Sequence, residues 1–120
     1  MAHLNLLVIR ASDPWNVARF YSILGLEFVE EKHESGPSHL SCDLGSSLFE
    51  IYPLGRKGQP TTGTRLGFAV RSLAETLEDI AQSSSSSILE SPHETEWGLT
   101  ALVLDPEGHR VELTEAASTS

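Results

Sequence analysis

Two glutamates stand at corresponding places in two similar segments of this 120-residue chain. Glu50 is the third residue of LFEIY at 48–52, and Glu112 is the third residue of RVELT at 110–114. Side chains alternate between the two faces of a strand, so each glutamate points away from the face that its apolar neighbours share. Two carboxylates that meet in one cleft can bind a cationic group or a metal ion. These two residues are therefore the first candidates for a site.

The glutamates belong to a longer internal repeat. The strand-like runs that begin at Leu6 and Arg65 are separated by the same number of residues as Asp13 and Ser72, which each open a helix-like run. The separation between the two glutamates is three residues greater, which leaves room for a short insertion in the second copy. Two copies are too few for a solenoid, which needs three or more repeats. The repeat instead predicts a pair of modules that enclose one shared cleft.

Each copy reads as one strand, one helix and three further strands. Asp13 caps and Pro14 starts the first helix, Ser72 caps the second, and the apolar residues of each helix fall on one face. The expected strands span 4–11, 26–32, 38–44 and 47–53 in the first copy, and 64–71, 87–91, 97–104 and 109–114 in the second. Residues 54–63 are predicted to form the linker between the copies, and the serine run 83–87 is predicted to be a flexible connector.

Strand alternation also divides the side chains between two faces. One set is apolar throughout and is expected to pack under the helices: Leu7, Ile9, Phe49, Ile51, Leu66, Phe68, Val70, Val111 and Leu113. The opposite set is mixed, as suits the lining of a cleft, and it includes Leu6, Glu50, Tyr52, Arg65 and Glu112. A pseudo-twofold axis between the copies would bring the two glutamates together, with Leu6 and Arg65 near that axis.

Two further residues are candidates for the same cleft. His39 alternates with Leu40 and lies on the mixed face, although a solvated strand histidine is the competing interpretation. Trp97 stands at the start of a strand, where it would either meet a ligand or cover the edge of the sheet. The other histidines show no compact metal-ligand spacing. His109 is expected at the surface because it follows a turn and points away from Glu112.

Composition narrows the classes of function. The formal charge of −9, from 17 acidic and 8 basic residues, argues against a surface for nucleic acid or for an anionic membrane, which basic residues would have to neutralise. A neutral or cationic small ligand fits better. The single cysteine, Cys42, fits a reducing compartment and a small core position. No apolar run reaches the roughly 20 residues that span a bilayer, so a cytoplasmic protein that binds neither nucleic acid nor membrane is expected.

Three features carry a family resemblance over roughly residues 3–115. They are the paired strand-helix-strand units, Phe20-Tyr21 followed by Leu24-Gly25-Leu26, and the run Asp105-Pro106-Glu107-Gly108-His109-Arg110-Val111-Glu112-Leu113. The chain resembles the vicinal oxygen chelate superfamily, which includes glyoxalase I, extradiol dioxygenases, fosfomycin-resistance enzymes and bleomycin-resistance proteins. The resemblance implies an α+β fold in which two βαβββ modules, about 4–53 and 64–115, form a curved mixed sheet around a shared cleft. The helices would lie on its outer face, and the protein would be a homodimer.

The resemblance also locates a metal site that this sequence does not complete. Catalytic members bind a divalent metal with one ligand from the first strand of each module and a glutamate, or its counterpart, from the last strand. Those positions hold Leu6, Glu50, Arg65 and Glu112 here. Leucine has no donor atom and a guanidinium stays protonated, so no metal cofactor is predicted. A divalent metal, if present, would use Glu50 and Glu112, and otherwise Arg65 is the counter-charge for the two acids.

Three functions therefore stay open at the level of sequence. The leading one is a metal-free protein that binds a small organic, cationic molecule in the cleft between the modules. The second is a metal-dependent lyase or dioxygenase that uses Glu50, Glu112 and an atypical further ligand such as His39. The third is an interaction module whose cleft is closed by an ion network around Arg65. Whether the chain is an enzyme thus depends on the metal.

Overall fold

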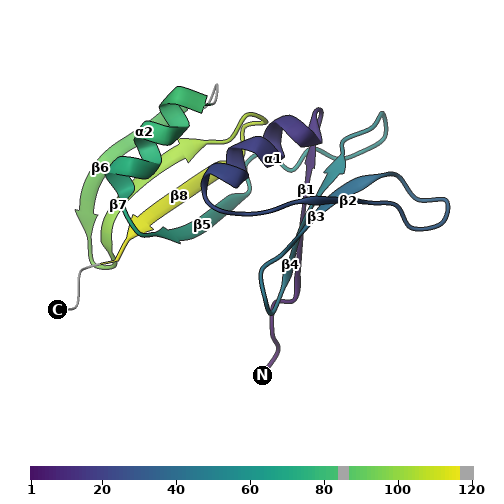
Figure 1. Ribbon diagram of the computed structural model, residues 1–120, viewed down its shortest axis with the longest axis horizontal. Helices are drawn as coiled ribbons and strands as arrows, with labels where there is room; N and C mark the ends of the chain where they lie inside the picture. Colours follow the sequence, from purple (N-terminus) through teal and green to yellow (C-terminus); the bar gives the residue numbers. More distant parts are fainter. Residues whose placement is uncertain (84–86, 117–120) are drawn as a thin grey trace. The chain divides into compact units, whose positions relative to one another are not determined.

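The computed structural model describes residues 1–83 and 87–116. The chain divides into two compact units, Met1–Thr61 and Thr62–Ser120. Each unit contains a strand, a helix and three more strands, in that order along the chain (Figure 1). The predicted α+β fold of two βαβββ modules is therefore confirmed.

The first unit is a four-stranded mixed sheet with one helix on one face. Its elements are β1 (Leu6–Ala11), α1 (Pro14–Ile23), β2 (Val29–Glu31), β3 (His39–Asp43) and β4 (Leu48–Pro53). The strand order is β1-β4-β3-β2, with β1 parallel to β4 and the other pairs antiparallel. Helix α1 contacts β1, β3 and β4, which leaves the other face of this sheet for polar side chains.

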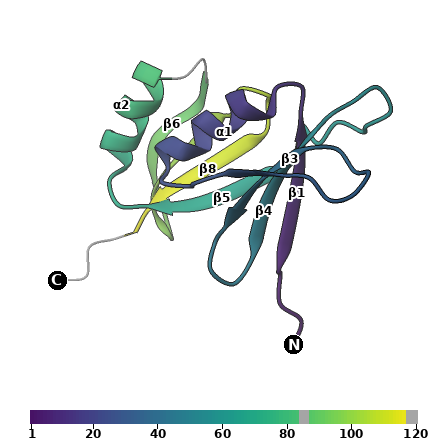
Figure 2. The same cartoon turned by 45° about the vertical axis from the view of Figure 1, so that its right-hand side comes forward.

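The second unit repeats this topology (Figure 2). Its elements are β5 (Arg65–Val70), α2 (Leu73–Ser83), β6 (Ser87–Thr95), β7 (Gly98–Leu104) and β8 (Arg110–Glu115). The strand order is β5-β8-β7-β6, again with one parallel pair, β5 and β8, and two antiparallel pairs. Helix α2 contacts β7 and β8.

The strand register supports the internal repeat. In the first unit Val8 of β1 pairs with Glu50 of β4, and in the second unit Gly67 of β5 pairs with Glu112 of β8. Val8 and Gly67 are separated along the chain by the same number of residues as Leu6 and Arg65. The two glutamates thus occupy equivalent places in equivalent sheets, because each stands beside the same position of its parallel neighbour.

Both helices begin as their sequences predict. The Asp13 side chain accepts a hydrogen bond from the backbone N–H of Asn16, and proline follows at the first position of α1. The Ser72 hydroxyl accepts a bond from the N–H of Glu75 at the start of α2. A carboxylate oxygen of Glu115 also accepts the N–H of Leu73, where the helix dipole favours negative charge. In the described part of the chain, neither helix has the length and apolar character to cross a membrane.

Six of the nine apolar residues expected to pack under the helices are buried, whereas Leu7, Phe68 and Val70 are half-buried. Buried apolar residues of the first unit are Ile9, Ala11, Val17, Ala18, Phe20, Tyr21, Leu40, Cys42, Phe49 and Ile51. Those of the second unit are Leu66, Leu73, Ile80, Ala101, Leu102, Val103, Val111 and Leu113. In the first unit Tyr21 meets Phe20 and Phe49 edge to face, at centroid distances of 4.9 and 5.0 Å. Burial raises the pKa of the Cys42 thiol, which fits a core position rather than a nucleophile.

One strand is longer than its sequence indicates. A strand was expected at 87–91, but β6 continues to Thr95. The proline at position 92 cannot donate to the ladder, and the pairing with β7 shifts register between Glu90 and His93. The irregularity accommodates the proline without ending the strand. Of the expected serine connector, Ser83 ends α2 and Ser87 begins β6, and residues 84–86 lie outside the described residues.

Candidate functional site

The open face of the first unit carries a row of polar side chains across three strands. Glu50 on β4 is 8 % exposed and stands opposite Ser41 on β3. His39 on β3 pairs across the sheet with Glu31 on β2. Tyr52, two residues beyond Glu50, stacks on the His39 ring with a centroid distance of 4.2 Å and an angle of 5° between the ring planes. The structure thus brings together Glu50, Tyr52 and His39, three of the predicted cleft residues.

His39 is buried rather than solvated. The residue is 3 % exposed, because the Tyr52 ring covers one side of it and strands β2 and β4 flank it. Its Nδ1 atom lies 3.3 Å from the carbonyl oxygen of Pro37. Its Nε2 atom has no hydrogen-bond partner, although it lies 3.6 Å from Glu50 Oε2 and 3.9 Å from Glu31 Oε1. A buried polar atom without a partner is costly.

Two members of this group were missed at the level of sequence. Glu31 ends β2, and His33 follows two residues later. The His33 ring lies 5.3 Å from the His39 ring, centroid to centroid. One ligand atom from each of Glu31, His33 and His39 lies within 4.8 Å of the other two. The spacing of Glu31 and His33 was the available signal, because residues two apart share a strand face.

The carboxylates of Glu50 and Glu31 also affect the pKa of Tyr52. Burial raises the pKa of its phenol, and the negative charges of Glu50 and Glu31 raise it further. The hydroxyl therefore stays protonated at neutral pH and can donate a hydrogen bond to a ligand.

In the second unit Arg65 and Glu112 form an ion pair. Arg65 Nη2 donates a hydrogen bond to Glu112 Oε1 at 2.6 Å, across the β5–β8 pair. This bond and the negative charge of Glu112 raise the pKa of the guanidinium. Both side chains remain open to solvent, at 53 % and 35 % exposure. The pair can exchange its partners for a ligand at little cost, because exposed ion pairs are weak.

Trp97 and Glu112 border two hollows on the same unit. One hollow, of about 190 Å³, is lined by Arg65, Glu90, His93, Thr95, Trp97, Thr100, Ala101, Leu102 and Glu112. The other, of about 350 Å³, is lined by Gly67, Phe68, Ala69, Trp97, Glu112 and Thr114. Trp97 is 72 % exposed, so it is not buried against the edge of the sheet. Arg65, Trp97 and Glu112, the predicted cleft residues of this unit, therefore lie together.

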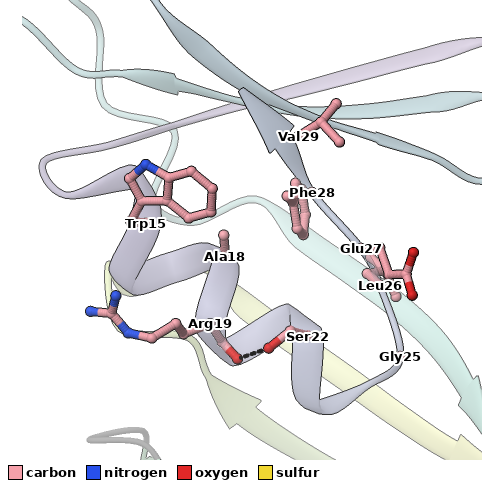
Figure 3. Close-up of a pocket in the computed structure, with 9 residues that line it drawn as sticks. All are labelled: Trp15, Ala18, Arg19, Ser22, Gly25, Leu26, Glu27, Phe28 and Val29. Atoms are coloured by element: carbon pink, nitrogen blue, oxygen red, sulfur yellow. Dashed lines mark hydrogen bonds between the residues drawn. The ribbon is translucent and has the colours of Figure 1, made fainter. Parts of the chain in front are cut away.

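A larger hollow of about 540 Å³ lies on the helix side of the first unit (Figure 3). Trp15 and Ala18 of α1 line one side of it, Phe28 lines it from the segment before β2, and Val29 lines it from the start of β2. The lining also includes Arg19, Ser22 and Glu27. Two of these polar side chains have partners within α1: Arg19 donates to Asn16 Oδ1 at 3.2 Å, and the Ser22 hydroxyl donates to the carbonyl oxygen of Arg19 at 2.7 Å. In Figure 3 the Arg19 guanidinium and the Glu27 carboxylate point to opposite sides. Binding chemistry needs convergent polar groups, so we place the candidate site on the open sheet faces instead.

The ligand positions implied by the resemblance do not fit a metal ion. Leu6 is 47 % exposed on β1 and offers no donor atom. Arg65 places a positive charge against Glu112, at the position where an ion would need a free carboxylate. Of the four positions only Glu50 and Glu112 carry ligand atoms, and two carboxylates alone are a poor site for Zn²⁺ or Fe²⁺.

His109 is buried, which corrects the expectation of a surface residue. It is 0 % exposed, and its Nδ1 atom lies 2.9 Å from Asp105 Oδ2. The other oxygen of Asp105 accepts the backbone N–H groups of Glu107, Gly108 and His109 at 2.9–3.0 Å. The turn folds back over the histidine, a contact that strand alternation does not reveal. The pair holds the turn before β8, and with it the start of the strand that carries Glu112.

Comparison with known proteins gives one family. Residues 3–113 match the model of the Glyoxalase/Bleomycin resistance protein/Dioxygenase superfamily. Among curated proteins, no sequence matches the chain.

Solved structures show the same fold at low sequence identity. TnmS3, an antibiotic binding protein from Streptomyces sp. CB03234, is 16 % identical with a TM-score of 0.76, and the match covers 98 % of each chain. TioX from Micromonospora sp. ML1 is 19 % identical with a TM-score of 0.71, and the match covers 97 % of this chain and 100 % of TioX. The virulence protein STM3117 from Salmonella typhimurium is 22 % identical with a TM-score of 0.71, covering 98 % of both chains.

Proposed function

Because the chain belongs to the Glyoxalase/Bleomycin resistance protein/Dioxygenase superfamily, we propose that it binds a small organic cation on the open sheet face that carries Trp97 and Glu112. The modules are residues 4–53 and 64–115, joined by 54–63. No metal at the superfamily's ligand positions takes part. One observation carries the proposal: the exposed Trp97 indole and the Glu112 carboxylate border the same two hollows. An aromatic face and a carboxylate together attract an organic cation.

The charges of the site favour a cation over an anion. The carboxylates of Glu90 and Glu112 line one hollow beside a single guanidinium, that of Arg65. A net charge of −9 over the chain adds a long-range attraction for cations. A cationic ligand would displace Arg65 from Glu112 and take over its ion pair.

The similarity to TnmS3 supports an organic ligand of antibiotic size. That protein is described as an antibiotic binding protein, and its fold matches this chain over its length. A lyase or dioxygenase of the same superfamily is the rival function. It is the weaker proposal because Leu6 and Arg65 stand where the further metal ligands would be needed. We further propose that the protein works in the cytoplasm as a homodimer.

Thermal shift and tryptophan fluorescence test this function. Bleomycin and ethidium are the probes, the first as the antibiotic in the family's description and the second as a simple aromatic cation. Each is titrated in the presence of EDTA, so that binding cannot depend on a metal. Binding to the folded state raises the melting temperature. We expect a shift with at least one probe, together with quenching of Trp97.

Single-tryptophan variants locate the probe. Trp15→Phe keeps Trp97 as its only tryptophan, and Trp97→Phe keeps Trp15, which lies on α1. Quenching should persist in Trp15→Phe, and both quenching and affinity should fall in Trp97→Phe. No thermal shift with either probe at large excess would contradict the proposal. Quenching confined to Trp15 would contradict the proposed place of binding.

A further inference from the structure

Glu31, His33 and His39, none of which is a ligand position of the superfamily, form a candidate metal site beside Glu50, which is one. We infer that Glu31, His33 and His39 bind a divalent transition-metal ion on the open face of the first unit, with Glu50 next to them as the fourth ligand. The inference is independent of the proposed small-molecule function. It departs from the expectation that the chain holds no metal.

The donor set suits such an ion. Two imidazole nitrogens and one or two carboxylate oxygens are ligands that Zn²⁺, Co²⁺ and Ni²⁺ accept. One atom from each of Glu31, His33 and His39 already lies within 4.8 Å of the others. His39 Nε2 stands 3.6 Å from Glu50 Oε2 and 3.9 Å from Glu31 Oε1. Ligands of a tetrahedral zinc at its usual bond lengths are about 3.3 Å apart, so small side-chain movements would complete the site.

The unsatisfied nitrogen of His39 is the second, independent observation. Among the described residues, Nε2 of this buried ring is a side-chain atom with no hydrogen-bond partner. The other ring nitrogen lies 3.3 Å from the Pro37 carbonyl oxygen, an acceptor, so Nδ1 carries the proton. In the neutral ring Nε2 is then a lone pair that faces two carboxylates, which are acceptors too. A cation between the three groups removes this conflict.

The surroundings of His39 resemble the support that metal-binding histidines normally have. Such a histidine donates its second ring N–H to a carbonyl or carboxylate, which fixes the tautomer and the ring orientation. Pro37 supplies the carbonyl oxygen. The stacked Tyr52 ring holds the imidazole plane, and His33 is exposed and close enough to approach from the solvent side.

The second unit provides an internal comparison. Leu102 pairs with Glu112 as Ser41 pairs with Glu50, so Thr100 corresponds to His39. His93 pairs with Thr100 as Glu31 pairs with His39. A histidine and a threonine thus replace the glutamate and the buried histidine in the second copy. The group of ligands belongs to the first unit alone among the described residues.

Metal titration of the tag-free protein tests the inference. After EDTA treatment and dialysis, Zn²⁺ is titrated in a calorimeter, and Co²⁺ is followed by its visible absorption, which reports tetrahedral coordination. We expect one ion per chain, and a Zn²⁺-dependent rise in melting temperature. His33→Ala, at an exposed residue that does not threaten folding, should weaken Zn²⁺ binding by more than about tenfold. His39→Gln and Glu31→Gln should do the same.

Matched variants separate this site from the rest of the surface. Glu30→Gln lies on the same strand but on its other face, and His93→Ala changes an exposed histidine of the second unit. Both should bind Zn²⁺ as the unchanged protein does. In EDTA, His33→Ala should bind bleomycin and ethidium as the unchanged protein does. The metal proposal and the small-molecule proposal can therefore fail independently of each other. Absence of Zn²⁺ binding, or binding that survives in both His33→Ala and His39→Gln, would overturn the inference.

Discussion

At the scale of single residues, the Arg65–Glu112 pair has two interpretations that differ in their energetic consequences. A structural ion pair should stabilise the fold, whereas a pair held at a ligand site should be easy to break. The exposure of both side chains, 53 % and 35 %, favours the second, because solvent screens the attraction and holding two long side chains costs entropy. The hydrogen bond between Arg65 and Glu112 is short, but a ligand can replace either partner.

Substitution of either Arg65 or Glu112 should therefore change the affinity for ethidium more than it changes the melting temperature. In Arg65→Met the melting temperature should stay within error of the unchanged protein, and Arg71→Met, at an exposed residue before α2, is the matched control. Ethidium should bind about three- to tenfold more tightly, because Glu112 is freed. Glu112→Gln should weaken binding by a similar factor. Fluorescence titration measures both, and a large loss of stability in Arg65→Met would show that the pair is structural.

His39 shows why single residues of the site were only partly predictable. Strand alternation placed it on the face of Glu50 and Tyr52, and the structure agrees. Its burial and its proximity to Glu31 depend on how β2 pairs with β3, and that register follows from the turn between them rather than from either strand. The proximity of His33 to His39 depends on the same turn, so the two-residue spacing of Glu31 and His33 was only part of the signal that the site needed.

At the scale of elements, the turn before β8 depends on one buried carboxylate. Asp105 accepts three backbone N–H groups and contacts His109, and both residues are buried, at 3 % and 0 % exposure. Removal of a charged acceptor from buried donors costs more than the loss of an exposed bond, since the donors keep no partner and no water. The turn also sets the place of the strand that carries Glu112.

Asp105→Ala should thus lower the free energy of unfolding by about 2–4 kcal/mol. Asp43→Ala is the matched control, because Asp43 is exposed and accepts one N–H, that of Gly45, at 2.7 Å. Loss of this hydrogen bond should lower the free energy of unfolding by about 1 kcal/mol or less. Urea denaturation of the two variants measures the difference. Equal losses in the two variants would contradict the role of burial in this turn.

The elements themselves were largely predictable because their signals are local. Asp13 and Ser72 act as helix caps, and the alternation of apolar side chains fixed the buried faces. The predicted end of β6 at residue 91 was wrong, because the strand continues past Pro92 to Thr95 with a shift of register. Sequence alternation predicts a face where the ladder is regular, and it fails where a bulge changes the count.

At the scale of the whole molecule, several large apolar side chains remain exposed. In the first unit Leu6 of β1 pairs with Leu48 of β4, and these residues are 47 % and 40 % exposed, with Leu4 beside them in the chain at 73 %. Contiguous exposed apolar side chains on a soluble protein mark a contact surface. A second copy of the chain is the partner that the superfamily resemblance implies.

We therefore predict a homodimer in solution. Light scattering after size exclusion should give twice the 13.1 kDa mass of the chain. Leu48→Asp should shift the equilibrium toward the monomer, because a charge at an apolar interface must be desolvated without a partner. Leu44→Asp, at a residue that is 46 % exposed beyond the end of β3, should leave the mass unchanged. A 13.1 kDa species at every concentration would contradict the dimer, and a dimer unaffected by Leu48→Asp would place the interface elsewhere.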